Sequence, residues 1–368
     1  MAAYLTARGQ KDSPTSPPAR YFHYICSIMD NCRKAYWILA SAFMLLFLGN
    51  LVYGAVNIPI DEVLGILAGN GSEKESWNMI VLNSRLPQCI TALLAGAGLA
   101  ISGLLLQTLF KNPLAGPSIL GISDGANLGV AMIMLYSGGL LGGIKGGAYF
   151  SMIAAALAGS LAVLSLIIYF SRKVRSNVML LIIGIMIGYL ASSVISILNY
   201  HAAADKVHQF VMWGMGDFTG VSVEKLPYFA SFTLAGLIYS LLLIKPLNAL
   251  LLGEMYAANL GVKIKSARIS ILLCTGILTA AITAFCGPVS FIGLAVPHVA
   301  RMLLGTSNHR HLVPVTILSG ACIAMLCNML TVVPGSNSLL PLNAVTPMIG
   351  APIIIYVIIN RKNLQYFN

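Results

Sequence analysis

One apolar stretch, residues 85–129, constrains the fold more than any other part of the chain. Its hydrophobic run is long enough to cross a bilayer as a helix, which takes about 20 residues. The run carries many small side chains, namely Gly96, Gly98, Ala100, Ser102 and Gly103. Two Pro-containing breaks follow it, at 112–113 and 116–117. Small residues let helices approach closely, and breaks at membrane depth are tolerated only against protein or a water-filled path. We therefore predict that this stretch lines a pathway and does not face lipid.

Composition places most of the chain in a membrane. Hydrophobic residues make up 58% of the 368 residues and charged residues only 9%, with a mean hydropathy of +0.84. Soluble domains carry about 25% charged residues. The formal net charge of +11 would indicate nucleic acid in a soluble protein, but no basic patch is interleaved with aromatic residues. Basic residues gather at the cytoplasmic ends of membrane helices, so we expect membrane lipid around the chain and exclude a nucleic-acid partner.

Hydrophobic runs separated by polar or glycine-rich segments predict an all-α polytopic protein with about ten membrane spans. The expected spans cover residues 36–56, 86–110, 114–137, 148–171, 178–200, 226–247, 268–286, 291–304, 313–333 and 342–359. Between the first two, apolar residues at 60, 63, 64 and 67 have helical spacing. This spacing predicts a short helix at the outer surface.

The distribution of Lys and Arg orients these spans. With both termini in the cytoplasm, all but five of the 22 basic residues fall in the tails, inner loops or inner helix ends. The five on the outer side are Lys74, Arg85, Lys145, Lys206 and Lys225. This bias follows the positive-inside rule. We expect a flexible cytoplasmic tail over 1–34, a transmembrane domain over 35–360 with an inner polar segment at about 248–267, and a cytoplasmic tail over 361–368.

A weak internal echo points to two related halves. Arg85 precedes a small-residue helix, proline breaks and the triplet 119–121, whereas Arg268 precedes a similar helix, Pro288 and the triplet 291–293. Because five spans separate the two copies, they would run in opposite directions. Inverted repeats of this kind are common in transporters.

The motifs of several enzyme and metal-site classes are missing from the sequence. It contains no G-x-x-x-x-G-K-[ST] loop to cradle ATP, no H-E-x-x-H motif and no His-Cys cluster. The seven cysteines form no C-x-x-C pair, and five lie in apolar segments, where a cysteine behaves as a small hydrophobic residue. We therefore expect no catalytic residue, no metal and no cofactor.

A few ionisable residues leave a functional and a structural interpretation open. Asp124 is the only acid clearly inside an apolar span, and an intramembrane carboxylate is by default a functional hypothesis. It could serve an ion-coupled secondary transporter, or it could bond backbone exposed by the nearby Pro and Gly breaks. His298 could be a ligand or could cap a broken helix. His309 and His311 are expected in a solvated loop.

Four motifs together resemble the membrane permeases of bacterial importers for ferric siderophores, haem and cobalamin. They are 85–87 with 95–103 and Gln107, 112–115 with 119–126, 252–261, and 287–298 with Arg301. A fifth motif, 350–352, is similar as well. The resemblance runs from about residue 36 to 362 and identifies the FecCD-like family of type II ABC importers, although it does not specify the substrate.

The resemblance implies an inner-membrane subunit without enzymatic activity, present as a homodimer around a central pathway. Two ATP-binding cassette ATPase subunits would sit on its cytoplasmic face, and a periplasmic or lipid-anchored binding protein would deliver the ligand. Residues matching the segment that couples to the ATPase are Gly253, Glu254, Ala257, Leu260 and Gly261. Ser176 and Asn177 match the inner gate, and Gly96, Gly98, Ser102 and Gln107 would line the pathway beside it. The segment 210–216 would lie by the outer gate.

The sequence departs from the family pattern at several outer positions. Gln88 stands where relatives often carry a second Arg, Asn328 and Val332 stand where they often carry Asp and Arg, and Leu-Leu-Pro at 339–341 replaces Glu-Leu-Pro. Relatives use outer arginines to grip acidic residues of the binding protein. Of this set only Arg85 is left, so we expect it to anchor docking, with Lys74, Lys206 or Lys225 as substitutes. A surface ion pair contributes about 0–1 kcal/mol, so shape and apolar contact would supply most of the affinity.

Overall fold

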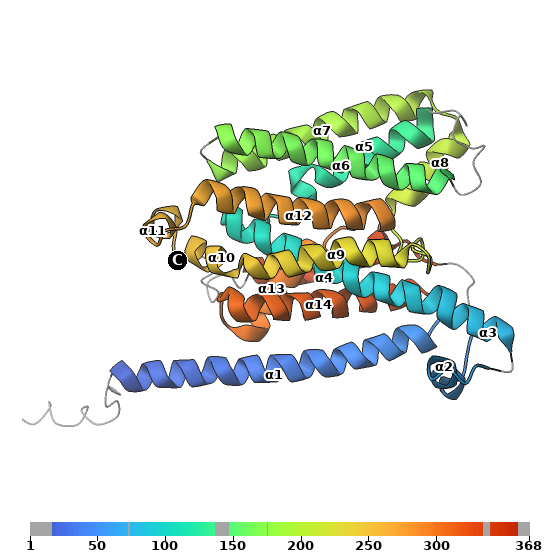
Figure 1. Cartoon of the computed structure of the whole chain (residues 1–368), viewed down its shortest axis with the longest axis horizontal. Helices are drawn as coiled ribbons and strands as arrows, with labels where there is room; N and C mark the ends of the chain where they lie inside the picture. The colour runs from blue at the N-terminus through green and yellow to red at the C-terminus, as the bar shows by residue number, and fades with distance from the viewer. Residues whose placement is uncertain (1–16, 73, 137–146, 175, 334–338, 360–368) are drawn as a thin grey trace, which may run out of the picture.

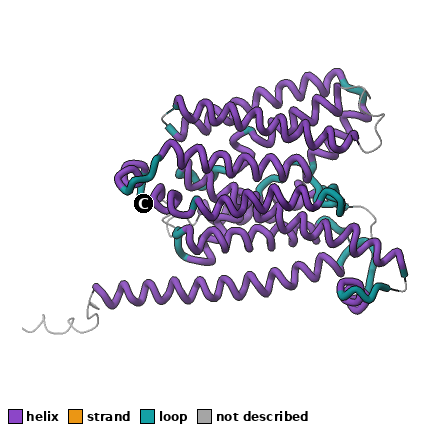
Figure 2. Tube along the Cα trace, in the orientation of Figure 1, coloured by secondary structure: helices purple, strands orange, loops and turns teal. Residues whose placement is uncertain are grey.

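A computed structural model of the chain describes residues 17–72, 74–136, 147–174, 176–333 and 339–359. Helices account for most of these residues, with loops between the helices (Figure 2), and the described ranges contain no β-strand. The long helices run roughly side by side as one bundle, with α1 along one edge and α7 along the opposite edge (Figure 1).

The helices follow one another with short connections. In chain order they are α1 (Pro17–Val52), α2 (Ile60–Leu67), α3 (Glu75–Ile80), η1 (Val81–Arg85), α4 (Leu86–Phe110), η2 (Pro117–Leu120), α5 (Ile122–Ala131), η3 (Met132–Tyr136), α6 (Gly147–Lys173), α7 (Asn177–His201), α8 (Ala204–Gly214), α9 (Leu226–Leu242), α10 (Ile244–Leu251), α11 (Glu254–Asn259), α12 (Ile264–Cys286), α13 (Ile292–Leu304), α14 (His309–Leu330) and α15 (Leu342–Ile359). The turns η1 and η3 are π-helical and η2 is a 3₁₀ turn.

The membrane-spanning character of the bundle is confirmed. Seven described helices are long and apolar enough to cross a membrane, and the pair α9–α10, bent by 51°, would make an eighth span. Two shorter apolar helices, Ile122–Tyr136 and Ile292–Leu304, occupy the third and eighth expected spans. Both follow the Pro- and Gly-containing breaks, which shorten them. The expected count of ten is therefore approximate, while the all-α polytopic fold holds.

The first helix begins earlier than we expected. Residues 17–34, assigned above to a flexible tail, are helical and continue into the span of α1. Pro17 and Pro18 suit a first helical turn, where the missing N–H has no intrahelical partner anyway. No Gly or Pro interrupts the sequence from there to Gly49. The remaining parts of the expected tails, 1–16 and 361–368, lie outside the described residues.

The two halves of the bundle are inverted repeats, as the internal echo predicts. α4 packs on α14 and α13, and α12 correspondingly packs on α6 and α5. The pairs α5–α6 and α5–α7 likewise have counterparts in α13–α14 and α13–α15. α4 ends beside Gly253, whereas α12 begins at that same end and finishes at Cys286, next to Asp217.

α4 lies in the middle of the bundle and is buried along almost its whole length (Figure 1). Its glycines bring backbones into direct contact. A Cβ on Gly96 would lie 2.2 Å from the carbonyl oxygen of Gly320 in α14, and a Cβ on Gly103 would lie 1.5 Å from that of Gly293 in α13. In lipid, this kind of close packing is a main source of helix association.

The burial of α4 bears on our prediction for the pathway. Gly96, Gly98, Ser102 and Gln107 are all buried within a single copy of the chain. They hold α4 against its neighbours in this structure, which does not expose them to a passage between two subunits, and their place on the pathway stays a prediction. The same small side chains serve both purposes, so the sequence pattern does not distinguish a packed core helix from a pathway wall.

We expect Gly103→Ala to destabilise the protein strongly, because its Cβ would overlap the backbone of α13. Overpacking typically lowers the free energy of unfolding by about 1–3 kcal/mol. We expect a loss at the upper end of that range, because here two backbones must separate. The matched control is Gly98→Ala in the same helix, where the new Cβ meets the end of the Ile282 side chain at 2.7 Å. Thermal unfolding of the detergent-solubilised variants measures the difference; equal midpoints would contradict the close crossing.

Candidate functional site

The segment between α9 and α12 forms a compact projection at one end of the bundle, called here the α11 end (Figure 1). Gly253 and Gly261 bracket α11 with φ angles of +110° and +84°, which side-chain-bearing residues rarely adopt. Ala257, a residue of α11 itself, is buried. Four apolar side chains around it are between 64% and 79% exposed, namely Leu252, Met255, Tyr256 and Leu260. Exposed apolar residues gathered on a short helix are typical of a surface that docks a partner.

Glu254, the first residue of α11, joins the starts of two transmembrane helices. Its Oε1 accepts a hydrogen bond of 2.8 Å from Nδ2 of Asn177, at the start of α7. The same oxygen lies 3.4 Å from Nη2 of Arg268, near the start of α12. The Glu254 side chain is 42% exposed and that of Arg268 only 7%. The residues predicted separately for coupling and for the inner gate therefore meet in one place.

This Glu254 cluster (Glu254, Asn177 and Arg268) also binds the ends of two further helices. Asn177 Nδ2 donates to the carbonyl of Leu109 in α4 at 3.0 Å. Arg268 Nη1 donates to the carbonyl of Val174, just past the end of α6, at 3.1 Å. A cation at a helix C-terminus satisfies free carbonyls and interacts favourably with the helix dipole. Movement of α11 cannot leave α7 and α12 unaffected unless these bonds break.

Ser176 and Arg268 have roles that the sequence only partly indicated. Ser176 is the N-cap residue of α7, and its side chain makes no capping hydrogen bond. Arg268 was singled out in the internal echo but not as a site residue. Its pairing with Glu254 depends on the bend of the chain at Gly253 and Gly261, which the sequence did not reveal.

A second polar network lies buried between α4 and α13. Arg301 Nη1 donates to Oε1 of Gln107 at 2.7 Å, and Gln107 Nε2 donates to the carbonyl of Leu294 at 3.1 Å. Gln107 is thus a cross-link inside the bundle and has no surface to offer a transported ligand.

His309 corrects our expectation of a solvated loop, because it is buried as the first residue of α14. Its Nδ1 lies 2.9 Å from Oδ1 of Asn248 in α10, and its Nε2 lies 3.0 Å from Oγ1 of Thr108 in α4. The backbone N–H of His309 donates to the same Asn248 atom at 2.8 Å, which identifies that atom as oxygen. His309 therefore links the helix beside α11 to the central helix α4.

The two residues with open interpretations take structural positions. His298 Nε2 lies 2.8 Å from the carbonyl of Pro113, so it ties α13 to the break after α4. The Asp124 carboxylate lies where α5 passes Gly188 of α7, so close that a Cβ there would be 2.5 Å from Oδ2. Within the described part of the chain, no three His, Cys, Asp or Glu side chains gather as a cluster around a metal.

Arg85 is buried, contrary to the exposed position that a docking anchor needs. Its relative exposure is 6%, and its guanidinium donates to the carbonyls of Leu51 and Val52 at 2.8 and 2.7 Å, and to that of Val56. These groups belong to the end of α1 and the loop after it. Arg85 therefore caps α1, and its geometry does not support the docking role that we expected for it.

Two of the departures from the family pattern turn out to be partners. Gln88 Nε2 donates to Oδ1 of Asn328 at 2.9 Å, and Asn328 Nδ2 donates to Oδ1 of Asn50 at 2.7 Å. Where relatives often carry Arg and Asp, this chain has a neutral amide chain between α1, α4 and α14. Neutral hydrogen bonds avoid the cost of burying an ion pair.

We expect Arg85→Ala to lower the thermal unfolding midpoint of the purified protein, since it leaves buried carbonyls without a donor. Each unsatisfied buried group costs about 1–3 kcal/mol. Lys206→Ala, which removes an exposed cation of α8, is the matched control and should leave the midpoint unchanged. If Arg85→Ala unfolds like the wild type, the guanidinium does not hold α1 in place.

Comparisons with known proteins agree with this architecture. Residues 42–360 match the FecCD transport family. The chain is 34% identical to the hemin transport system permease protein HmuU of Yersinia pestis, over 88% of this chain and 96% of the relative. It is 31% identical to the vitamin B12 import system permease protein BtuC of Klebsiella pneumoniae subsp. pneumoniae, over 90% and 95% of the two chains.

A solved structure shows the same fold. It is described as an inward-facing conformation of a metal-chelate type ABC transporter, and it superimposes with a TM-score of 0.77 at 29% identity, covering 90% of this chain and 99% of that one. The family match spans most of the chain, and the relatives are transport permeases, not enzymes. The chain therefore belongs to the FecCD transport family and is a multi-pass membrane permease of an ABC importer.

Proposed function

We propose that this permease carries an iron chelate, haem or a corrinoid across the bacterial inner membrane, as a homodimer driven by two separate ATPase subunits. The observation that carries the proposal is the Glu254 cluster, which joins an exposed apolar helix to the starts of α7 and α12. The substrate class is supported by the relatives, which are named for hemin and vitamin B12 transport.

In this proposal the ATPase subunit receives the apolar side chains of α11. Leu252, Met255, Tyr256 and Leu260 would enter a groove on the partner, as amphipathic helices commonly do. Nucleotide binding would then move α11, and Glu254 would pass the movement to Asn177 and Arg268. Because Ser176 and Asn177 begin α7, the inner end of α7 would act as the gate.

The pathway is better placed against α7 than against α4. The outward face of α7 exposes Tyr189 and the hydroxyl-bearing Ser192, Ser193 and Ser196. Polar side chains within a membrane normally face protein or a water-filled cavity. The hydroxyls of Ser193 and Ser196 are bonded to carbonyls of their own helix, at 2.9 Å in both cases. A second copy opposite this face would enclose a smooth passage suited to a large ligand.

The α11 end is the cytoplasmic end in this proposal. Basic residues concentrate there, at Arg172, Lys173, Lys245, Lys263 and Lys265, as the positive-inside rule requires. α1 begins at the same end (Figure 1). The opposite end, called the α8 end, would then meet the binding protein. With Arg85 buried, docking would depend on the exposed Lys74 and Lys206 and on the exposed apolar Leu339 and Leu340.

We expect Glu254→Lys to uncouple ATP hydrolysis from uptake, because it places a cation against Arg268 and removes the acceptor of Asn177. Losing a charge-assisted hydrogen bond of about 1.5–3 kcal/mol should reduce uptake by roughly tenfold or more. The assay is ATP-driven uptake of hemin, a ferric siderophore or cobalamin into proteoliposomes that contain the permease and its ATPase subunits. Binding of the delivery protein should persist.

Glu62→Lys makes the same charge change at the opposite end of the bundle, in α2, and is the control for net charge. Normal uptake by an assembled Glu254→Lys permease would show that the cluster does not couple. Uptake by the permease alone, driven by an ion gradient and independent of ATP, would overturn the proposed function as a whole.

A further inference from the structure

We propose that Asn343 is a positioning residue that latches α15 to the α8 end of the bundle, and that this end of the pathway opens only when the latch releases. The consequence for transport rests on the proposed function, whereas the latch itself can be tested without transport.

The latch is one side chain that joins three segments distant in sequence. Asn343 Nδ2 donates to the carbonyls of Pro288 at 2.7 Å and of Gly214 at 3.2 Å. Its Oδ1 accepts from the backbone N–H of Ser290 at 3.0 Å. The backbone N–H of Asn343 donates to the carbonyl of Met215, also at 3.0 Å. The end of α8, the turn before α13 and the start of α15 therefore meet at a single amide.

The chemistry of these contacts requires an asparagine. The backbone N–H of Ser290 can only donate, so the atom that faces it must be the amide oxygen. The two backbone carbonyls can only accept, so they must face the amide nitrogen. A carboxylate of the same shape would keep the first bond and would set its second oxygen against two carbonyls.

The segments that Asn343 joins are pressed together and include strained backbone. A Cβ on Gly287 would lie 2.6 Å from the carbonyl of Trp213, and a Cβ on Gly216 would lie 2.9 Å from that of Pro288. Phe291 has a φ of +66°, which is a true outlier for a bulky residue and is typical of sites that change conformation. A Cβ added to Gly350 of α15 would lie 2.9 Å from the Cβ of Phe291. The turn that contains Phe291 therefore contacts α15 at a second point.

The inverted repeat gives the latch a counterpart at the other end. α7 and α15 occupy matching places in the two halves, packing on α5 and α13. α7 starts with Asn177, whose amide donates to the carbonyl of Leu109 and to Glu254 at the α11 end. α15 starts with Leu342 and Asn343 at the α8 end. Each of these two helices thus has an asparagine, at its first or second residue, that fixes it to the neighbouring helix ends.

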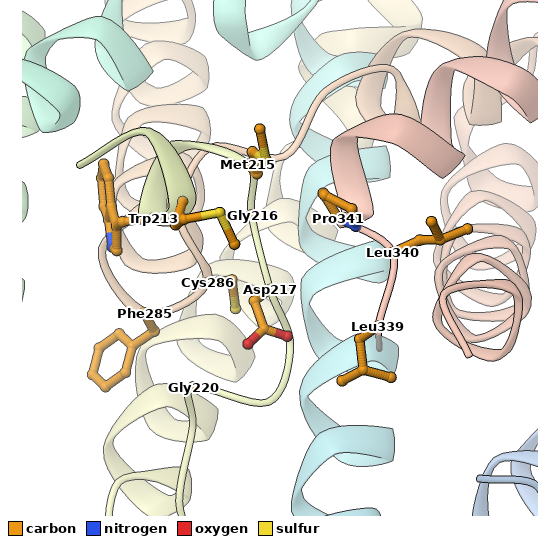
Figure 3. Close-up of a pocket in the computed structure, with 11 residues that line it drawn as sticks. Trp213, Met215, Gly216, Asp217, Gly220, Phe285, Cys286, Leu339, Leu340 and Pro341 are labelled. Carbon is orange, nitrogen blue, oxygen red and sulfur yellow. The ribbon is translucent and has the colours of Figure 1, made fainter. Parts of the chain in front are cut away.

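A cavity beside the latch provides a native reporter of its release. It has a volume of about 370 Å³ and is lined by Trp213, Met215, Phe285, Cys286 and Pro341 among others. Figure 3 shows Cys286 beside Asp217, with Pro341 and Leu339 of the segment leading into α15 on the far side from Trp213. Asp217 N–H donates to the carbonyl of Cys286 at 2.8 Å, and Cys286 is only 3% exposed. Release of α15 would open this cavity to solvent.

The test measures how fast a maleimide modifies Cys286 in the full chain in lipid nanodiscs, with the modified residue identified by mass spectrometry. We expect Asn343→Asp to raise the Cys286 rate by about tenfold, the effect of losing two hydrogen bonds from the closed state. Cys274, buried in the middle of the same helix, is the internal reference and should not change. Asn70→Asp makes the same substitution in an exposed loop and should label like the wild type.

Unchanged labelling of Cys286 in Asn343→Asp would overturn the latch, as would an equal increase at Cys274, which would indicate general loosening. If the Asp variant does not assemble, Asn343→Ser decides, because its hydroxyl is too short to reach both carbonyls and should give an intermediate rate. ATP-driven uptake by the same preparations separates the two proposals. If Cys286 of the wild type is labelled as expected but the wild type does not transport, the proposed function is contradicted and the latch is not.

Discussion

The direct contact of backbones at α4 is the constraint on which the rest of the structure depends. Gly96 against Gly320 and Gly103 against Gly293 leave no room for a side chain, so α4, α13 and α14 form a block that cannot slide without separating. Within a membrane, where burial of apolar surface gives little drive, such packing carries much of the stability. α7, which is proposed to border the pathway, packs mainly on α5, and α15, which carries the Asn343 latch, packs mainly on α13. Both lie outside this block. Motion in transport is therefore expected at the periphery and not at the centre.

Hydrogen bonds at the helix ends connect this fixed centre to the parts that must move. At the α11 end, Glu254 is half exposed while its partner Arg268 is buried, so a docking partner can reach the carboxylate without exposing the guanidinium. At the α8 end, the hydrogen bonds of Asn343 are all neutral and go to backbone groups. The junction at the α11 end therefore contains a charged pair, and the junction at the α8 end contains only neutral groups. The helices of the two halves are nevertheless arranged alike.

The sequence was sufficient for the architecture and insufficient for the partners of individual side chains. Hydrophobic runs placed the expected spans on helices, although only seven or eight of the described helices are long and apolar enough to cross a membrane. The Arg85 and Arg268 echo predicted the inverted repeat. The pathway was placed on α4 because glycines that pack helices and glycines that line a passage look identical in one sequence. Arg85 and His309 were taken as exposed because burial depends on neighbours far along the chain. Gln88 and Asn328 looked like separate departures, and only their hydrogen bond of 2.9 Å shows that they are partners.

We infer that α11 and the start of α7 move together because Glu254 binds Asn177. Spin labels at Ala258 on α11 and Met179 on α7, both exposed and neither among the proposed docking side chains, measure this directly by double electron–electron resonance in the assembled importer. We expect their separation to stay constant when a non-hydrolysable ATP analogue is added, while the distance from Met179 to a label at Leu45 of α1 changes. An Ala258–Met179 distance that changes while α7 stays fixed relative to α1 would contradict the coupling described above.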